Sequence, residues 1–242
     1  MKHLLILVLF LLSSASFSLA QDDSEDHEHM DMGAHHHHDQ SMAETPQTQL
    51  GYHVNLFGVG MYQTGQRGRQ AVASPEMIML NFDLPSGAKS YWSLETMLTF
   101  ERWTFPQTGY PLFTQIGEAN ELGAPYLDAQ HPHSSPLMGL MLSHNWNWTV
   151  NSGLKIFAAP RGESTDGPVA FMHRLTGDVN PDAPLGHHVG QDVGHISSTV
   201  VGAKIRFEKF DFELSGFNGL EPLPMKIDLP VGALNSIASR LT

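Results

Sequence analysis

Hydrophobic and polar residues alternate with a period of two along most of the chain from residue 51 onward. Trp92, Leu94 and Leu98 share one parity of such a segment, while Ser93 and Glu95 share the other. Successive side chains of a β-strand point to opposite faces, so this alternation predicts strands. We expect strands at about 53–62, 75–84, 90–101, 137–149, 154–159, 196–207 and 210–217, and the start of another near Ile237. The sequence supports no long helix in this region.

The predicted strands are joined alternately by short and long connections. The short ones are 85–89, 150–153 and 208–209, and the long ones are 63–74, 102–136, 160–195 and 218 onward. Outer-membrane barrels have tight periplasmic turns and long external loops, and their tilted strands span the bilayer with about ten residues. We therefore expect an all-β fold, an antiparallel transmembrane β-barrel of which about eight strands lie in this chain. Trp146 and Trp148 precede a short turn and would belong to the periplasmic aromatic girdle.

A soluble β-sandwich is the alternative fold, because its strands alternate in the same way. Loops of about 35 residues are uncommon in compact domains and favour the barrel. His144 lies on the apolar parity of its strand and favours the sandwich. The strand beginning near Ile237 stops at Thr242, so we expect residues 51–242 to be an incomplete barrel domain, because an open strand edge in lipid is costly.

The first residues of the chain have the pattern of an export signal. Lys2 precedes an apolar run from Leu4 to Leu12, and Ser18-Leu19-Ala20 provides a small-x-small cleavage site. The run is too short for a membrane helix, which needs about 20 residues. We expect residues 1–20 to be a cleaved signal peptide, and the mature protein to lie in outer-membrane lipid of a Gram-negative bacterium.

Residues 21–50 form an acidic segment rich in histidine and methionine. The segment has too little apolar surface to form a core, so we expect it to be disordered. Imidazole and thioether groups suit copper, with silver, zinc and nickel as alternatives. The candidate metal ligands of this tract are His27, His29, Met30, Met32, His35, His36, His37 and His38. A solvated acidic tail is the alternative interpretation.

A second group of candidate ligands lies in the predicted long loops. These ligands are Asp128, His131, His133, His173, His187, His188, Asp192 and His195. The long loops of a barrel emerge on one side, which would bring nitrogen and oxygen ligands together. Alternatively, these histidines only pack the loops through hydrogen bonds.

Methionines form a further pattern inside the predicted barrel. Met77, Met79, Met97 and Met141 fall on the polar parity of their strands and would face the lumen. Thioethers there either pass soft Cu(I) or Ag(I) ions or fill irregular gaps.

Composition excludes several functional classes. The formal net charge is −12, whereas proteins that bind nucleic acid need a basic face. The chain has no cysteine, which excludes disulfides, thiolate zinc sites and a cysteine nucleophile. It has neither a Gly-x-Ser-x-Gly elbow nor a phosphate-binding loop, so we expect no enzymatic activity.

Several short stretches occur in an order that suggests a family. They are Gly109-Tyr110-Pro111-Leu112, Gln115-Ile116-Gly117-Glu118, 128–133, 171–174, 184–188, Asp192, His195-Ile196, Phe217-Asn218-Gly219 and Glu221-Pro222. With them, residues 51–242 resemble uncharacterised bacterial outer-membrane barrel proteins often encoded beside copper- and silver-resistance genes. Ser134 departs from the acidic residue usual there, and Val189 from an aromatic one.

The resemblance implies an outer-membrane location and a metal context, with periplasmic metal-efflux components as partners. It carries over no catalytic residue. Together with the residues above, it predicts a barrel that binds or handles copper-like ions in metal resistance or homeostasis. The alternatives are a soluble periplasmic metal-sequestering β-sandwich and a structural barrel without a metal role.

Overall fold

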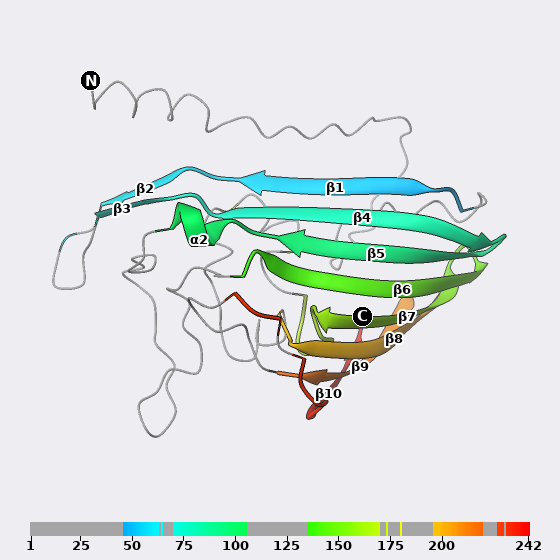
Figure 1. The fold of residues 1–242 in the computed structure, drawn as a ribbon. Helices are drawn as coiled ribbons and strands as arrows, with labels where there is room; N and C mark the ends of the chain where they lie inside the picture. Colours follow the sequence, from blue (N-terminus) through cyan, green and yellow to red (C-terminus); the bar gives the residue numbers. More distant parts are fainter. Residues whose placement is uncertain are drawn as a thin grey trace.

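The computed structural model describes residues 46–62, 64, 70–105, 135–169, 173, 180, 196–219, 227–229 and 231–242. Most of these residues form antiparallel β-structure, as the alternating sequence pattern predicts (Figure 1). The predicted signal peptide and residues 21–45 of the histidine-rich tract lie outside this part of the chain. The end of that tract is described, and the expectation of disorder is wrong there, because Gln49 and Leu50 begin a β-strand that pairs with Asp83 and Phe82. No helix within it is long and apolar enough to cross a membrane.

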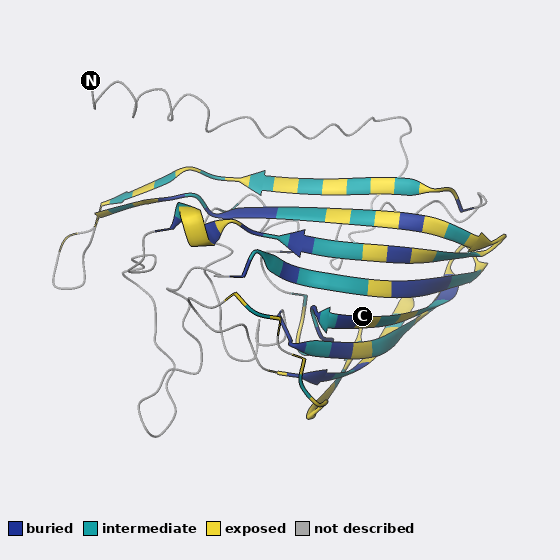
Figure 2. Cartoon of the chain, viewed as in Figure 1, coloured by how far each residue is buried: buried dark blue, intermediate teal, exposed yellow. Residues whose placement is uncertain are grey.

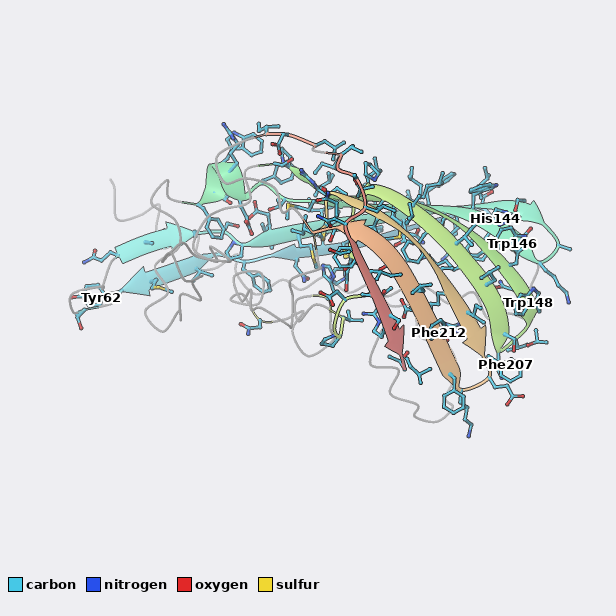
Figure 3. All side chains as sticks on the ribbon, turned by 90° about the horizontal axis from the view of Figure 1, so that it is seen from below. Tyr62, His144, Trp146, Trp148, Phe207 and Phe212 are labelled. Atoms are coloured by element: carbon cyan, nitrogen blue, oxygen red, sulfur yellow. The ribbon has the colours of Figure 1, made fainter. Side chains whose placement is uncertain are left out.

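One large sheet dominates the fold. Its strands are β1 (Gln49–Leu56), β4 (Glu76–Gly87), β5 (Ser90–Leu98), β6 (Leu137–Thr149), β7 (Ser152–Arg161), β8 (Thr199–Phe207), β9 (Phe210–Asn218) and β10 (Ser236–Leu241). All eight strands follow one another in this order across the sheet, and every neighbouring pair is antiparallel. The sheet curves from β1 to β10 into an open trough (Figures 1 and 3).

The strands depart most from the predictions in two places, while several other strand ends shift by a few residues. The strand expected over 53–62 is divided into β1 and β2 (Val59–Tyr62), and β2 pairs with β3 (Gln70–Ala73) in a region expected to be loop. Pro75 lacks a backbone N–H, and the ladder is interrupted beside it, where the N–H of Phe57 donates to its carbonyl oxygen.

The strand expected over 90–101 ends early, at Leu98. It is followed by the short helix α2 (Glu101–Thr104). The hydroxyl of Thr99 accepts a hydrogen bond from the N–H of Glu101 at 3.3 Å. Such a local side-chain bond competes with the strand ladder and favours a turn.

Short and long connections alternate along the main sheet. The hairpins β4–β5, β6–β7 and β8–β9 turn at 88–89, 150–151 and 208–209, all at the same end of the sheet. Glu208 has a φ of 52°, the left-handed conformation that tight hairpin turns require. The other connections begin and end at the opposite end of the sheet, which is called the long-connection end below.

The two faces of the sheet differ sharply in polarity. One continuous cross-strand row consists of Leu50, Phe82, Leu94, Leu142, Ala158, Val201, Gly216 and Ile237. Its large side chains are exposed, 49% for Leu142 and 43% for Leu94. We call this the outer face. The adjacent row on the other face, the inner face, includes Asp83, Ser93 and Ser143, which are buried. Figure 2 shows exposed and less exposed positions alternating along β1 and β4.

Buried apolar residues are few and lie towards the long-connection end. One cluster contains Met77, Met97, Met138 and Ile196, with Met79 packed against it. A second cluster contains Ala159, Val200 and Phe217, with Met141 and Phe157 packed against it. Within the described residues, many large apolar side chains of the main sheet therefore remain exposed on the outer face, while polar ones such as Asp83 and Ser143 are buried.

Candidate functional site

His173 is the one predicted metal ligand that the structure describes. The remaining candidates lie outside the described residues: His27, His29, Met30, Met32, His35, His36, His37, His38, Asp128, His131, His133, His187, His188, Asp192 and His195. Whether these side chains come together is therefore still a prediction.

The imidazole of His173 is buried beside a carboxylate. Its Nδ1 lies 2.9 Å from Oε2 of Glu163, and the residue is 8% exposed. Such a carboxylate fixes the ring orientation and tautomer, and a proton on Nδ1 leaves the lone pair on Nε2 to accept a hydrogen bond or ligate a metal. Sequence reasoning missed Glu163, which follows the end of β7 by two residues. In the part of the chain that the structure describes, no group of three or more His, Cys, Asp or Glu side chains is placed to hold a metal.

The inner face carries a network of ion pairs. Nζ of Lys155 on β7 lies 2.8 Å from Oε1 of Glu95 on β5, reaching across β6. Nζ of Lys204 lies 2.6 Å from Asp211 and 3.7 Å from Glu213. Further pairs are Arg206–Asp211 and Arg240–Glu213. The sequence contained a signal for this network, because these charges all fall on the polar parity of their strands.

Arg161, at the end of β7, is fully buried. Its guanidinium donates to the carbonyl oxygens of Leu137 and Asp228, each at 2.8 Å, and lies 3.5 Å from Oδ1 of Asp228. The hydroxyl of Ser135 also donates to the Asp228 carbonyl, at 3.3 Å. Arg161 thereby fastens the segment 227–229 to the start of β6.

His144 occupies an unusual position on the apolar parity of β6. This position of a histidine favours a sandwich. The ring is nevertheless only 7% exposed, because two tryptophans cover it. Its centroid lies 4.4 Å from that of Trp92 and 4.0 Å from that of Trp146. Oγ of Ser86 lies 2.9 Å from Nε2. The Nε2 side of the ring thus has a hydrogen-bond partner, and Figure 3 shows His144 beside Trp146.

Aromatic residues gather at the turn end of the outer face. This set contains Trp92, Trp146, Trp148, Phe207, Phe210 and Phe212. Most are strongly exposed, 51% for Trp148 and 63% for Phe207. At the long-connection end, Phe100 just before α2 and Trp103 within it are exposed, with ring centroids 6.0 Å apart. The exposed apolar row crosses the strands, and aromatic side chains therefore lie on both sides of it, towards the two ends of the strands.

A buried carboxylate lies beneath α2. Glu76 is 5% exposed, and Oγ1 of Thr104 lies 3.1 Å from each of its carboxylate oxygens. The same hydroxyl lies 2.9 Å from the Ser74 carbonyl oxygen. Glu76 pairs with Leu56 in the ladder, so its side chain belongs to the outer face. Helix α2 covers the Glu76 carboxylate there. The contacts indicate a structural role that joins α2 to β4.

Comparisons with protein-family models, characterised proteins and solved structures found no match to this chain. The family resemblance inferred from the sequence therefore stays a prediction. The geometry supplies three chemical possibilities: an apolar outer surface for lipid, a charged inner surface for water or ions, and thioether and imidazole groups for soft metals.

Proposed function

We propose that this chain forms part of the wall of an outer-membrane β-barrel that binds or handles copper-like metal ions. The inverted polarity of the sheet is the observation that supports the proposed membrane location. Its outer face exposes an apolar row that crosses all eight strands, while its inner face buries hydroxyls and the Asp83 carboxylate and carries partly exposed ion pairs.

Lipid is the partner that this outer face fits. Burying a large aliphatic or aromatic side chain is worth about 1.5–3 kcal/mol, so leaving Phe82, Leu94, Leu142 and their neighbours in water is costly. Soluble monomers rarely expose contiguous apolar patches larger than a few hundred Å². Acyl chains remove this cost along the whole row.

The dimensions and ends of the strands also support a membrane wall. The strands β5, β8 and β9 contain 9 residues each, and β7 contains 10. A tilted transmembrane strand needs about 9–11 residues. The aromatic residues that flank the aliphatic row correspond to the interfacial girdles of such barrels, with the turn end on the periplasmic side.

A closed wall requires neighbours for the two end strands of the sheet, β1 and β10. The soluble sandwich is the competing fold. It needs a second sheet to cover the apolar face, and within the described residues the only other sheet is the small pair β2–β3. The polarity of the main sheet therefore favours the barrel.

The metal part of the proposal rests on the predicted ligands in residues 21–50 and in the long loops. The buried His173–Glu163 pair supports it, because a carboxylate that orients an imidazole is the usual second partner of a metal-binding histidine. A barrel whose histidines only pack its loops is the competing function. Metal titration separates the two, as described in the Discussion.

Membrane fractionation of the full chain tests the proposed location. We expect the protein in the outer-membrane fraction, resistant to alkaline carbonate, and with a gel mobility that changes on heating in detergent. A periplasmic protein with a similar acidic charge, expressed in parallel, is the control. A mature protein that is monomeric and folded in buffer without detergent would overturn the proposal.

A further inference from the structure

The inner face changes character towards the long-connection end. Along β4 and β5 the polar residues Asn81 and Glu95 give way to Met79, Met77 and Met97. A packing role alone does not require methionine at successive inner positions, since strands favour β-branched and aromatic residues. The concentration of thioethers at one end of an otherwise polar face therefore needs a chemical explanation.

The register brings these methionines into reach of one another. Met79 and Met97 are directly opposite in the β4–β5 ladder. Residues opposite in an antiparallel pair have Cβ atoms about 4.5–5.5 Å apart, and diagonal neighbours about 7–8 Å. Met77 is the diagonal neighbour of Met97, and both belong to the buried cluster that also contains Met138. Three rotatable bonds in each side chain allow the sulfur atoms to converge.

The neighbouring strand contributes no side chain at this position. Gly139 is the β6 partner of Met97, so the row that begins with Met79 and Met97 continues without a side chain. A Cβ added at Gly139 would lie 3.5 Å from Cβ of Met97, which is an ordinary van der Waals contact. The thioethers of β4 and β5 therefore meet no side chain from this position of β6.

We propose that Met77, Met79 and Met97 form a thioether site for a soft monovalent cation, Cu(I) or its chemical equivalent Ag(I). Thioethers are neutral, soft ligands that select Cu(I) over hard cations. Without an anionic ligand beside them, they bind the doubly charged, borderline Zn²⁺ weakly. The site lies at the long-connection end of β4 and β5. This inference deepens the proposed function, because it names the cargo and a place for it inside the sheet.

The test is residue-resolved NMR of the full chain in detergent micelles, labelled at the methionine methyl groups and titrated with Ag(I). We expect the resonances of Met77, Met79 and Met97 to change together at one stoichiometric step. Met141 packs in the other cluster and serves as the internal control, since its resonance should not follow that step. An equal titration with Zn²⁺ should leave all of these signals unchanged.

Substitution with leucine, which nearly preserves volume, completes the test. The double variant M79L/M97L should lose the step, while the matched variant M141L should keep it. If Ag(I) changes only the signals of Met30, Met32 and Met42, the inner methionines only pack and the inference is wrong. The wild-type titration decides the matter even if the double variant does not fold. Membrane location is measured separately, so failure of this site and failure of the proposed function are distinguishable.

Discussion

At the scale of single residues, Leu142 distinguishes a lipid-facing wall from a surface in water. It lies in the middle of β6 on the outer face, between Leu94 and Ala158 in the cross-strand row. In water, an arginine at a position that is 49% exposed would be harmless or favourable. In lipid, a charge near the bilayer midplane costs about 2–4 kcal/mol.

We therefore expect Leu142→Arg to reduce strongly the amount of folded, heat-modifiable protein in the outer membrane. The matched control is Val150→Arg at a turn, which is 56% exposed and should be tolerated within about 0.5 kcal/mol. Urea unfolding in lipid vesicles gives the difference in free energy. Equal behaviour of the two variants would contradict the assignment of the outer face to lipid.

Residue alternation predicted which side chains share a face, because that depends only on neighbours along the chain. It could not predict how His144 is accommodated. The ring is shielded by Trp92 on the adjacent strand and by Trp146 two residues along β6, and it meets Ser86 in the β4–β5 hairpin. Two of those three contacts depend on cross-strand register, which the sequence does not state directly.

At the scale of elements, the ion pair between Glu95 and Lys155 connects strands that are not neighbours. Because it reaches over β6, it couples the β4–β5 hairpin to the β6–β7 hairpin. Both side chains are about one-fifth exposed, 19% and 21%, so solvent weakens the attraction only in part. We expect a coupling free energy of about 0.5–3 kcal/mol in a double-mutant cycle.

The charge-swapped pair tests this coupling. Glu95→Lys and Lys155→Glu should each lower the free energy of unfolding, and the double variant should recover part of the loss, because the opposite charges meet again. Lys209→Glu, in the β8–β9 turn, is a control for the change in net charge. Strict additivity of the two single effects would show that the contact contributes nothing to stability.

The accuracy of the element predictions follows from local physics. The strand over 137–149 has the predicted limits because its alternation is long and is ended by a turn. The pairing of β2 with β3 was missed. Residues 59–62 were expected to continue the strand from residue 53, and residues 70–73 to be loop, because a strand of four residues is too short for a periodic signal of its own. Helix α2 was missed because Glu101 and Thr99 continue the alternation of β5, whereas the Thr99 hydroxyl bond diverts the backbone.

At the scale of the whole molecule, the charged inner face and the acidic N-terminal tract are separate regions, and the metal binding of each has to be measured separately. A chain lacking residues 21–45 should still reach the outer membrane, because the first strand of the main sheet begins after them, at Gln49. We expect it to lose part of its bound copper but to keep a saturable fraction, measured by metal analysis after dialysis against a competing chelator.

The matched control for this deletion is a full-length chain in which His35, His36, His37 and His38 are replaced by serine. It should lose copper in the same direction but to a smaller extent, because the other tract ligands remain. Complete loss of stoichiometric binding on deletion would support the alternative in which the loop histidines only pack.

The sequence predicted the candidate site less completely than the fold. Histidine-rich stretches could be recognised from composition alone, yet their mutual distances depend on long connections. The described residues include two features that composition alone does not predict. Glu163 lies beside His173, and opposite charges meet on the inner face. The pair Arg206–Asp211 was within reach, since a two-residue turn fixes the register of β8 and β9.

The buried guanidinium of Arg161 has a consequence for how the chain can be shortened. Its hydrogen bonds to Leu137 and Asp228 connect the beginning of β6 to a segment more than sixty positions downstream. Ending the polypeptide ahead of Asp228 would leave a positive group in the interior without its counter-ion, a defect that typically costs about 3–5 kcal/mol. A chain that stops ahead of Asp228 therefore loses more than β10, because the middle of the sheet is weakened as well as its edge.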